Sequence, residues 1–234
     1  MDTTTLPGGK TALVEEFPLF SDVSQAGCVS IVSAAREKRF WRKQAIFSDG
    51  DPVEQVVVLL SGCVKITQIG PSGHEVILRL HGLGELVGAF CLSANGSRHY
   101  TTARAVQSST ALLWDAVTFE KLLERFPAFR RNAVRALEER LQETEQRLRE
   151  VSTENVSSRL SNELVRLSNR FGYAVNGYRE INLSHLELAQ LTGTTISTVS
   201  RLLCRWQRLG IVNILREAVQ VRDLAALAQL SQST

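Results

Sequence analysis

The clearest pattern in the chain is a pair of helical stripes between residues 183 and 212. Apolar residues and polar residues each recur there every three or four positions, which is the spacing of one helix face. The apolar stripe comprises Val199, Leu202, Leu203 and Trp206, and the polar stripe comprises Ser197, Arg201, Arg205 and Arg208. We therefore expect a helix that buries the first stripe and presents three arginines on the second.

A shorter helix is expected just before it. The residues that indicate this helix are Leu186, Ala189 and Gln190. Gly193 then accepts the positive φ that a tight turn between crossing helices requires, and Thr194 or Thr195 is placed to cap the second helix. This order predicts a helix-turn-helix that brings arginine to a DNA groove. The alternative is an ordinary helical hairpin with a solvated basic face.

Short apolar or alternating runs separated by glycine occupy the chain between about residues 40 and 118. The runs are VVVLLSG, CVKITQI, EVILRLHG, TTARAV and TALLWDA. Regular short strands with glycine turns are typical of an antiparallel barrel or sandwich. The sequence Gly70-Pro71-Ser72-Gly73 predicts a hairpin turn. Residues 1–15 are expected to form a loose tail.

A long helical pattern begins near Phe119 and carries a heptad seam. The seam positions are Val134, Leu137, Leu141, Thr144, Leu148, Val151 and Asn155. They alternate at spacings of three and four residues, as the a and d positions of a coiled coil do. The flanking sequence EERLQETEQRLRE is too polar for a helix buried in a core, so we predict a dimer seam. A helix packed only against its own barrel is the alternative.

The remaining segments complete a winged helix. Val156, Leu160, Leu164 and Leu167 predict a further helix, FGYAVNGYRE is expected to be a loop, and ILREAVQV predicts a two-stranded wing that turns near Arg216-Glu217. The fold class is thus α+β. We expect an N-terminal β-domain over 1–125, a dimerisation helix over 126–155 and a winged helix-turn-helix over 156–234.

Composition and charge narrow the class of protein. Of the 234 residues 44% are hydrophobic, and the longest aliphatic run, Val56 to Leu60, is far too short to span a membrane. The polar start MDTTTLPGGKT lacks the regions of a signal peptide, so a cytoplasmic protein is expected. The net charge is +3, but residues 156–234 hold nine arginines against five acids. The basic part is therefore the part that carries the helix-turn-helix.

The four cysteines do not form a metal site by their spacing. Cys28, Cys63, Cys91 and Cys204 are far apart, with no CxxC pair and no Cys/His cluster, which argues against zinc and against an iron–sulfur cluster. We expect no metal site, and we expect the cysteines to behave as small buried apolar residues. Because Cys204 falls in the second helix of the helix-turn-helix, a redox role for it is the alternative.

Taken in order, these segments resemble the Crp/Fnr family of bacterial transcription regulators over nearly the whole chain. The stretches SDGDPVEQVVVLLSGCVKI, PSGHEVIL and GLGELVGA are similar to landmarks of its β-domain, and ISTVSRLLCRWQRLGIV followed by VQVRDLAALAQL is similar to the Fnr-type branch. The resemblance implies an N-terminal antiparallel β-roll of the cyclic-nucleotide-binding jelly-roll type. It also implies a homodimer that binds a palindromic site on double-stranded DNA, contacts RNA polymerase and responds to an effector at the β-roll.

The resemblance also implies where an effector would bind. The nucleotide-binding members hold cyclic AMP with a Gly-Glu pair, an Arg-Ser or Arg-Thr pair and a Thr-Ser pair on the long helix. Gly84, Glu85 and Thr144 match, but His99-Tyr100 and Glu145 replace the arginine and serine positions. The phosphate would meet no matched arginine and an added carboxylate, which argues against cyclic AMP. The alternative is that Arg98, one position away, makes the contact through a shifted loop. The expected effector pocket comprises Gly84, Glu85, Arg98, His99 and Thr144.

Other effectors of such regulators remain open at this point. The chain lacks the N-terminal cysteine cluster of the Fnr-type oxygen sensors, which again argues against an iron–sulfur cluster. The sequence does not exclude haem as a cofactor. His74, His81 and His99 are only very weak candidates for its ligands.

The second helix of the helix-turn-helix is the recognition helix in this family. On it, Ser200-Arg201 matches the Fnr-type pair that contacts bases, and Ser197 replaces the family's usual glutamate. We expect Arg201 to read guanine. The predicted DNA-contacting residues are Thr195, Ile196, Ser197, Ser200, Arg201, Arg205 and Arg208. The alternative function is a ligand-binding regulatory module that acts on a protein partner. An enzyme is not expected, because the chain has no nucleophile elbow, Walker loop or HExxH motif.

Overall fold

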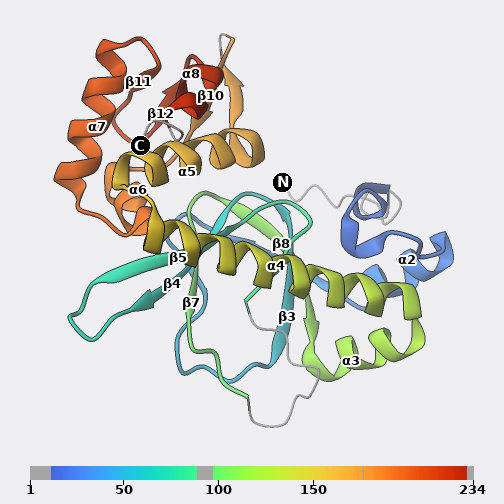
Figure 1. Cartoon of the computed structure of the whole chain (residues 1–234). Coiled ribbons are helices and arrows are strands. Elements are labelled where there is room, and N and C mark those ends of the chain that lie inside the picture. Colours follow the sequence, from blue (N-terminus) through green and yellow to red (C-terminus); the bar gives the residue numbers. More distant parts are fainter. Residues whose placement is uncertain (1–11, 89–96, 176, 231–234) are drawn as a thin grey trace. The chain divides into compact units, whose positions relative to one another are not determined.

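The computed structural model describes residues 12–88, 97–175 and 177–230, which form two compact units (Figure 1). The N-terminal unit comprises 1–68 and 78–142, and the C-terminal unit comprises 69–77 and 143–234, in each case within the described residues. Most of the predicted tail, residues 1–11, and Cys91 lie outside the described residues.

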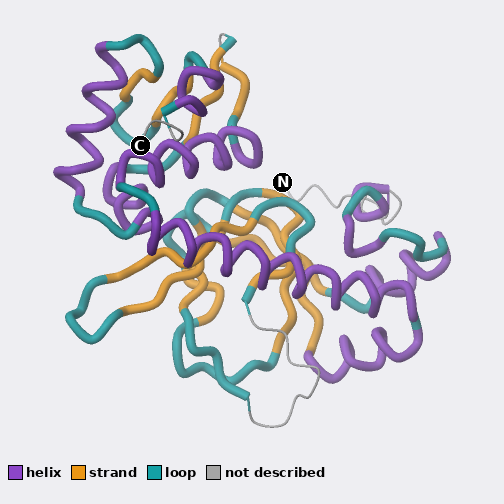
Figure 2. Tube along the Cα trace, viewed as in Figure 1, coloured by secondary structure: helices purple, strands orange, loops and turns teal. Residues whose placement is uncertain are grey.

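Two four-stranded sheets build the β-domain, and Figure 2 shows their strands in orange. Their strands are β1 (Arg36–Phe40), β2 (Ala45–Phe47), β3 (Gln55–Ser61), β4 (Val64–Ile69), β5 (Glu75–His81), β6 (Leu86–Val87), β7 (Thr102–Ala105) and β8 (Ser109–Asp115). The strand orders are β1-β8-β3-β6 and β2-β7-β4-β5. The pairs β1–β8, β3–β8, β3–β6, β2–β7 and β4–β7 are antiparallel. The five predicted strand runs are therefore confirmed.

Strand β3 explains the longest aliphatic run in the sequence. Val56, Val58 and Leu60 lie in one hydrophobic cluster with the flanking helices, whereas Val57 and Leu59 lie in the cluster between the sheets. A strand that is buried on both faces reads as a continuous apolar run instead of an alternating one. The position of β3 between the two hydrophobic clusters therefore explains why its sequence is continuously apolar.

Helices and a 3-10 turn flank the sheets. They include η1 (Pro18–Phe20), α2 (Gln25–Ser33), α3 (Ala116–Arg125) and the long α4 (Pro127–Thr153). Trp114 Nε1 donates to the Ile31 carbonyl at 2.8 Å, which ties α2 to β8. The buried Asn132 amide donates to the Leu19 and Ser21 carbonyls at 3.1 and 2.6 Å, which ties α4 to the segment before α2.

The predicted turn between β4 and β5 is also confirmed. The Gly73 amide donates to the Gly70 carbonyl and the Gly70 amide donates to the His74 carbonyl, both at 2.9 Å. Gly73 has φ +80°, a backbone conformation that residues other than glycine rarely adopt.

The C-terminal unit is a winged helix. Its elements are α5 (Val156–Phe171), β9 (Tyr173–Val175), β10 (Tyr178–Ile181), α6 (His185–Thr192), α7 (Ile196–Arg208), β11 (Val212–Ile214), β12 (Val219–Val221) and α8 (Leu224–Gln229). The sheet order is β11-β12-β10-β9, with antiparallel pairs. The predicted fold class, a β-domain followed by a long helix and a winged helix-turn-helix, is confirmed.

Two expectations about this part of the chain were wrong. FGYAVNGYRE was expected to be a loop, but most of it forms the β9–β10 hairpin, which pairs Glu180 with Tyr173. Asn155 was expected to end the dimer seam, but α4 ends at Thr153 and Asn155 caps α5, where its side chain accepts from the Ser158 amide at 3.0 Å. Asparagine is a favoured helix cap, and that preference decides its role here.

Candidate DNA-binding interface and effector domain

The turn between α6 and α7 is built as the sequence predicted. Gly193 ends α6 with φ +61° and ψ +47°, the left-handed conformation that glycine takes without strain. Thr195 begins α7 as its cap, and its hydroxyl oxygen accepts from the Thr198 amide at 3.3 Å. Ala189 of α6 and Val199 of α7 are both buried. The two helices are therefore fixed against each other through small and branched side chains.

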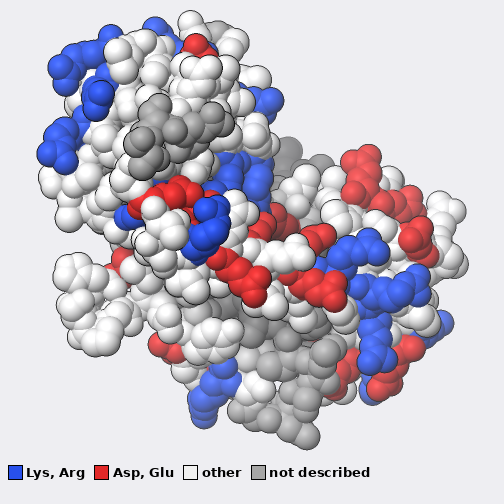
Figure 3. All heavy atoms as spheres, viewed as in Figure 1, with Lys and Arg blue, Asp and Glu red and all other residues white. Residues whose placement is uncertain are grey.

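Helix α7 has one buried face and one basic face. Val199, Leu203 and Trp206 are almost fully buried, while Leu202, which was expected to join them, is only half-buried. Arg201, Arg205 and Arg208 are exposed, and within the described residues none of them forms an ion pair with an acid. In Figure 3 the basic atoms run along α7. These guanidinium groups are thus available to an external anion.

The remaining residues of the predicted contact set lie at the start of the same helix. Ile196 and Ser197 are exposed, and the Thr195 hydroxyl lies 2.9 Å from that of Ser197. Ser200 is half-buried, and its hydroxyl lies 2.9 Å from Nδ1 of His185 in α6. Sequence reasoning missed this contact.

Sequence reasoning also missed the cap of α6. The side chain of Ser184 accepts from the Glu187 amide, and the Glu187 carboxylate accepts from the Ser184 amide at 2.9 Å. The signal for this capping box was present as serine followed three positions later by glutamate. The box fixes the first turn of α6, and with it His185.

A chain of amide hydrogen bonds joins α7 to the wing. Gln207 Nε2 donates to Asn213 at 3.2 Å, Asn213 Nδ2 donates to Gln220 at 3.0 Å, and Gln220 Nε2 donates to the Glu180 carboxylate at 2.8 Å. The last acceptor is a carboxylate, so the direction of every bond in the chain is set. These side chains therefore connect the wing strands β11 and β12 to α7 and to β10.

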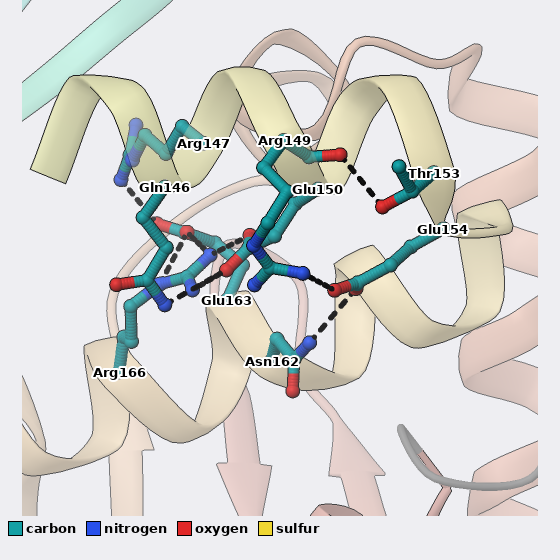
Figure 4. Close-up of polar contacts among 9 residues, drawn as sticks. All are labelled: Gln146, Arg147, Arg149, Glu150, Thr153, Glu154, Asn162, Glu163 and Arg166. Atoms are coloured by element: carbon teal, nitrogen blue, oxygen red, sulfur yellow. Dashed lines mark hydrogen bonds and ion pairs between the residues drawn. The ribbon is translucent and has the colours of Figure 1, made fainter.

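A buried ionic cluster joins the C-terminal part of α4 to α5 (Figure 4). Arg166 donates to both carboxylate oxygens of Glu150 at 2.7 and 2.9 Å and to Glu163 at 2.7 Å, and Arg147 donates to Glu163 at 2.9 Å. Burial alone would raise the pKa of Glu150, but the hydrogen bonds and charge of Arg166 outweigh it, so this pKa is lowered. The pKa of Arg166 is raised, because its two carboxylates outweigh its burial.

The predicted seam leaves large apolar side chains in solvent. The exposed fractions are 38% for Val134, 60% for Leu141, 68% for Leu148 and 56% for Val151. Thr144 is also exposed, whereas Leu137 packs partly against the core of the N-terminal unit. A stripe of exposed leucine and valine on a charged helix is typical of a surface that a second helix covers.

Gly84 and Glu85 of the expected effector pocket lie just before β6. Gly84 has φ +77°, and a side chain there would meet Phe17. Glu85 lies 3.1 Å from Nδ1 of the buried His81. Burial lowers the pKa of His81. The hydrogen bond and charge of Glu85 act in the opposite direction, and the nearby charges of Arg140 and Arg79 lower this pKa further.

Arg98 and His99 lie beside a different turn. Arg98 donates to the Gly50 carbonyl at 2.6 Å, and the His99 amide donates to the Asp51 carbonyl at 2.8 Å. The His99 ring stacks on Phe47 with 3.6 Å between ring centres. The structure therefore does not join Arg98 and His99 to Glu85 by a direct contact, and the segment 89–96 lies outside the described residues. The pocket stays a prediction.

The cysteines and possible metal ligands can be followed in the part of the chain that the structure describes. Cys28 and Cys63 are buried, as expected, but Cys204 is exposed on α7. Among the described residues no group of three or more histidine, cysteine or acidic side chains gathers in a way that could hold a metal ion. None of the described helices is long and apolar enough to cross a membrane.

Two family models match the chain. Residues 37–126 match the cyclic nucleotide-binding domain, and residues 158–230 match the Crp-like helix-turn-helix domain. The first match covers the β-domain, and the second covers the winged helix.

Curated relatives match over most of the chain. The fumarate and nitrate reduction regulatory protein of Escherichia coli K12 is 28% identical over 203 residues, which are 85% of this chain and 80% of that protein. The CRP-like cAMP-activated global transcriptional regulator of Mycobacterium tuberculosis H37Rv is 24% identical over 213 residues, which are 90% of this chain and 95% of that protein.

Solved structures share the fold. The structure of FixK2 from Bradyrhizobium japonicum has a TM-score of 0.72 at 20% identity, and covers 86% of this chain and 98% of its own. A transcriptional regulator of the CRP family from Thermus thermophilus also has a TM-score of 0.72, at 23% identity, with coverage of 84% and 97%. With both family models matched in the expected order, the chain carries a cyclic nucleotide-binding domain followed by a Crp-like helix-turn-helix domain, and these matches support the resemblance to the Crp/Fnr family of transcription regulators.

Proposed function

We propose that the protein is a homodimeric, sequence-specific DNA-binding transcription regulator whose DNA affinity is controlled at the β-domain. The observation that carries this proposal is the exposed face of α7, where Arg201, Arg205 and Arg208 have no acidic partner among the described residues. An arginine-rich helix of this kind fits the major groove of B-DNA and its phosphates.

The three arginines take different roles in this proposal. Arg201 lies in the first half of α7, one turn after the exposed Ser197. It is assigned to guanine, to which its guanidinium group can donate two hydrogen bonds. Arg205 and Arg208 lie one and two turns further along and are assigned to phosphates. Ser197 is shorter than a glutamate and both donates and accepts, so it discriminates less between bases.

The dimer is proposed to form through the exposed stripe of α4. Two copies of the stripe, which includes Leu141 and Leu148, would cover each other as coiled-coil helices do. A symmetric dimer presents two recognition helices, and these require a palindromic site with half-sites about one helical turn apart. Contact with RNA polymerase would follow from binding near a promoter.

Control by an effector is supported by contacts between α4 and β6. Arg140 of α4 donates to the carbonyls of Leu86 and Gly88 at 2.7 and 2.6 Å, and Arg79 donates to the Arg140 carbonyl at 2.8 Å. A ligand that shifts the segment Gly84–Gly88 would therefore also act on the helix that carries the seam. The sequence argues against cyclic AMP as that ligand, and haem stays open.

Binding of labelled DNA at several salt concentrations tests the function. The site is first selected by the protein from random DNA. Arg201→Ala should weaken binding to the selected site by roughly 1–3 kcal/mol and change binding to random DNA little. Arg208→Ala should weaken both and reduce the salt dependence by about one phosphate contact.

Arg36→Ala serves as the control, since it removes an exposed arginine from β1 in the other unit. Equal losses on both DNAs for Arg201→Ala would refute its assignment to a base. DNA binding that does not depend on salt would instead favour a regulatory module that acts on a protein partner.

A further inference from the structure

Ser200 is half-buried at the edge of the exposed side of α7, and it contacts a histidine from the preceding helix. It follows Ile196 and Ser197 by one turn and precedes Cys204 by one turn, and these three residues are exposed. Its hydroxyl oxygen is 2.9 Å from Nδ1 of His185, the first residue of α6. Ser200 therefore lies next to the exposed residues of α7, and its hydroxyl already forms one hydrogen bond, with His185.

The other ring nitrogen of His185 indicates the direction of this bond. Nε2 is buried and has no hydrogen-bond partner among the described residues. In a neutral imidazole ring one nitrogen donates and the other accepts. A buried N–H group without an acceptor is rarer in folded proteins than an unused acceptor. The proton therefore belongs on Nδ1, which donates to the oxygen of Ser200.

This direction decides what Ser200 can offer to DNA. A serine hydroxyl has one hydrogen and accepts with its oxygen. Because His185 supplies the hydrogen in their shared bond, the hydrogen of Ser200 is free to point outward. Guanine presents the acceptors O6 and N7 in the major groove and thymine presents O4, whereas cytosine presents only a donor there.

We propose that His185 is a positioning residue that makes Ser200 a donor toward an acceptor-bearing base and so sets the preference at one base pair of each half-site. The inference rests on the proposed function, because it requires α7 to lie in the groove. The capping box of Ser184 and Glu187 supports it, since it fixes the backbone at His185.

Four variants test this pair. Sites are selected from random DNA with the wild-type protein, and the dissociation constant is then measured on the selected site and on its single-base variants. His185→Phe keeps a ring but removes the donor, and Ser200→Ala removes the hydroxyl. Each should weaken binding to the selected site about tenfold and relax the same base pair. The double variant should lose no more than either single variant.

His185→Asn is the rescue variant. The side-chain nitrogen of asparagine lies about where Nδ1 of histidine lies and also donates, so affinity and base preference should stay close to those of the wild type. A side chain that merely filled space would not be rescued in this way. His74→Phe is the matched control, because it removes a Ser72–His74 contact of the same 2.9 Å length from an exposed turn.

The results distinguish this inference from the function itself. If Ser200→Ala relaxes one base pair and His185→Phe leaves it unchanged, the positioning role is wrong. It is also wrong if the loss in His185→Phe is equal on random DNA, or if asparagine does not restore the preference. Failure of the wild-type protein to select any site would overturn the regulator proposal instead.

Discussion

At the residue scale, two histidines of the β-domain are buried, and their environment opposes protonation. Burial lowers the pKa of His99 from its ordinary value of 6.5, although Asp51 acts in the opposite direction. The Nδ1 atom of His99 is buried and has no hydrogen-bond partner among the described residues. Protonation would place a charge on a buried ring whose Nδ1 has no hydrogen-bond acceptor among the described residues.

The free energy of unfolding should therefore fall as the pH drops below about 6.5. The unfolded chain takes up a proton at the ordinary pKa of histidine, whereas the folded chain does so only at lower pH. Each such group contributes at most about 1.4 kcal/mol for each pH unit. Urea unfolding of the wild type and of His99→Phe at pH 7.5 and at about pH 5.5 measures this effect.

The variant should lose less stability than the wild type between the two pH values. His81, whose pKa is also lowered, should account for part of the slope that remains. His74→Phe is the control, because His74 is exposed. An unchanged slope in His99→Phe would mean that the pH dependence comes from elsewhere.

At the element scale, the segments that sequence patterns predicted are those whose side chains are buried in a regular way. β3 was predictable because it is apolar on both faces, and α7 because Val199, Leu203 and Trp206 recur on one side. β1 was missed because REKRF is mostly charged and exposed. Its backbone bonds to β8 and its one buried side chain, Phe40, hold it in the sheet.

Contacts between elements were harder to predict than the elements. The cluster of Glu150, Glu163 and Arg166 joins two helices that were predicted from their apolar stripes, and these three residues lie outside those stripes, so neither pattern reveals it. The bond between His185 and Ser200 likewise depends on the crossing of α6 and α7. The β9–β10 hairpin could have been found, because Asn176-Gly177 is a strong sequence signal for a two-residue hairpin turn.

The seam of α4 gives a prediction at the same scale. Leu141→Asp combined with Leu148→Asp should yield monomers, because a dimer would bury carboxylates without partners. Light scattering measures the mass, and binding to a palindromic site should be lost with the dimer.

The matched control is Arg135→Asp combined with Gln142→Asp. These positions are also exposed and seven residues apart on α4, but each lies one residue past the seam. The control should stay dimeric. A double leucine variant of unchanged dimer mass would show that the seam lies elsewhere.

At the scale of the whole molecule, the proposed function requires a β-domain that senses a signal and a winged helix that binds DNA. Calorimetry should show no binding of cyclic AMP at physiological concentration. Arg98, the arginine nearest to the expected position, already donates to the Gly50 carbonyl, and Glu145 adds a negative charge to the helix. Saturable binding in the micromolar range that also raised DNA affinity would contradict this prediction.

The central claim is that two copies of α7 read one DNA site. Selection of binding sites from random DNA by the wild-type protein, followed by sequencing, tests it most directly. The account predicts an inverted repeat with a guanine in each half-site and centres about 10 base pairs, or one helical turn, apart. No enrichment, or a single asymmetric element without a repeat, would contradict it.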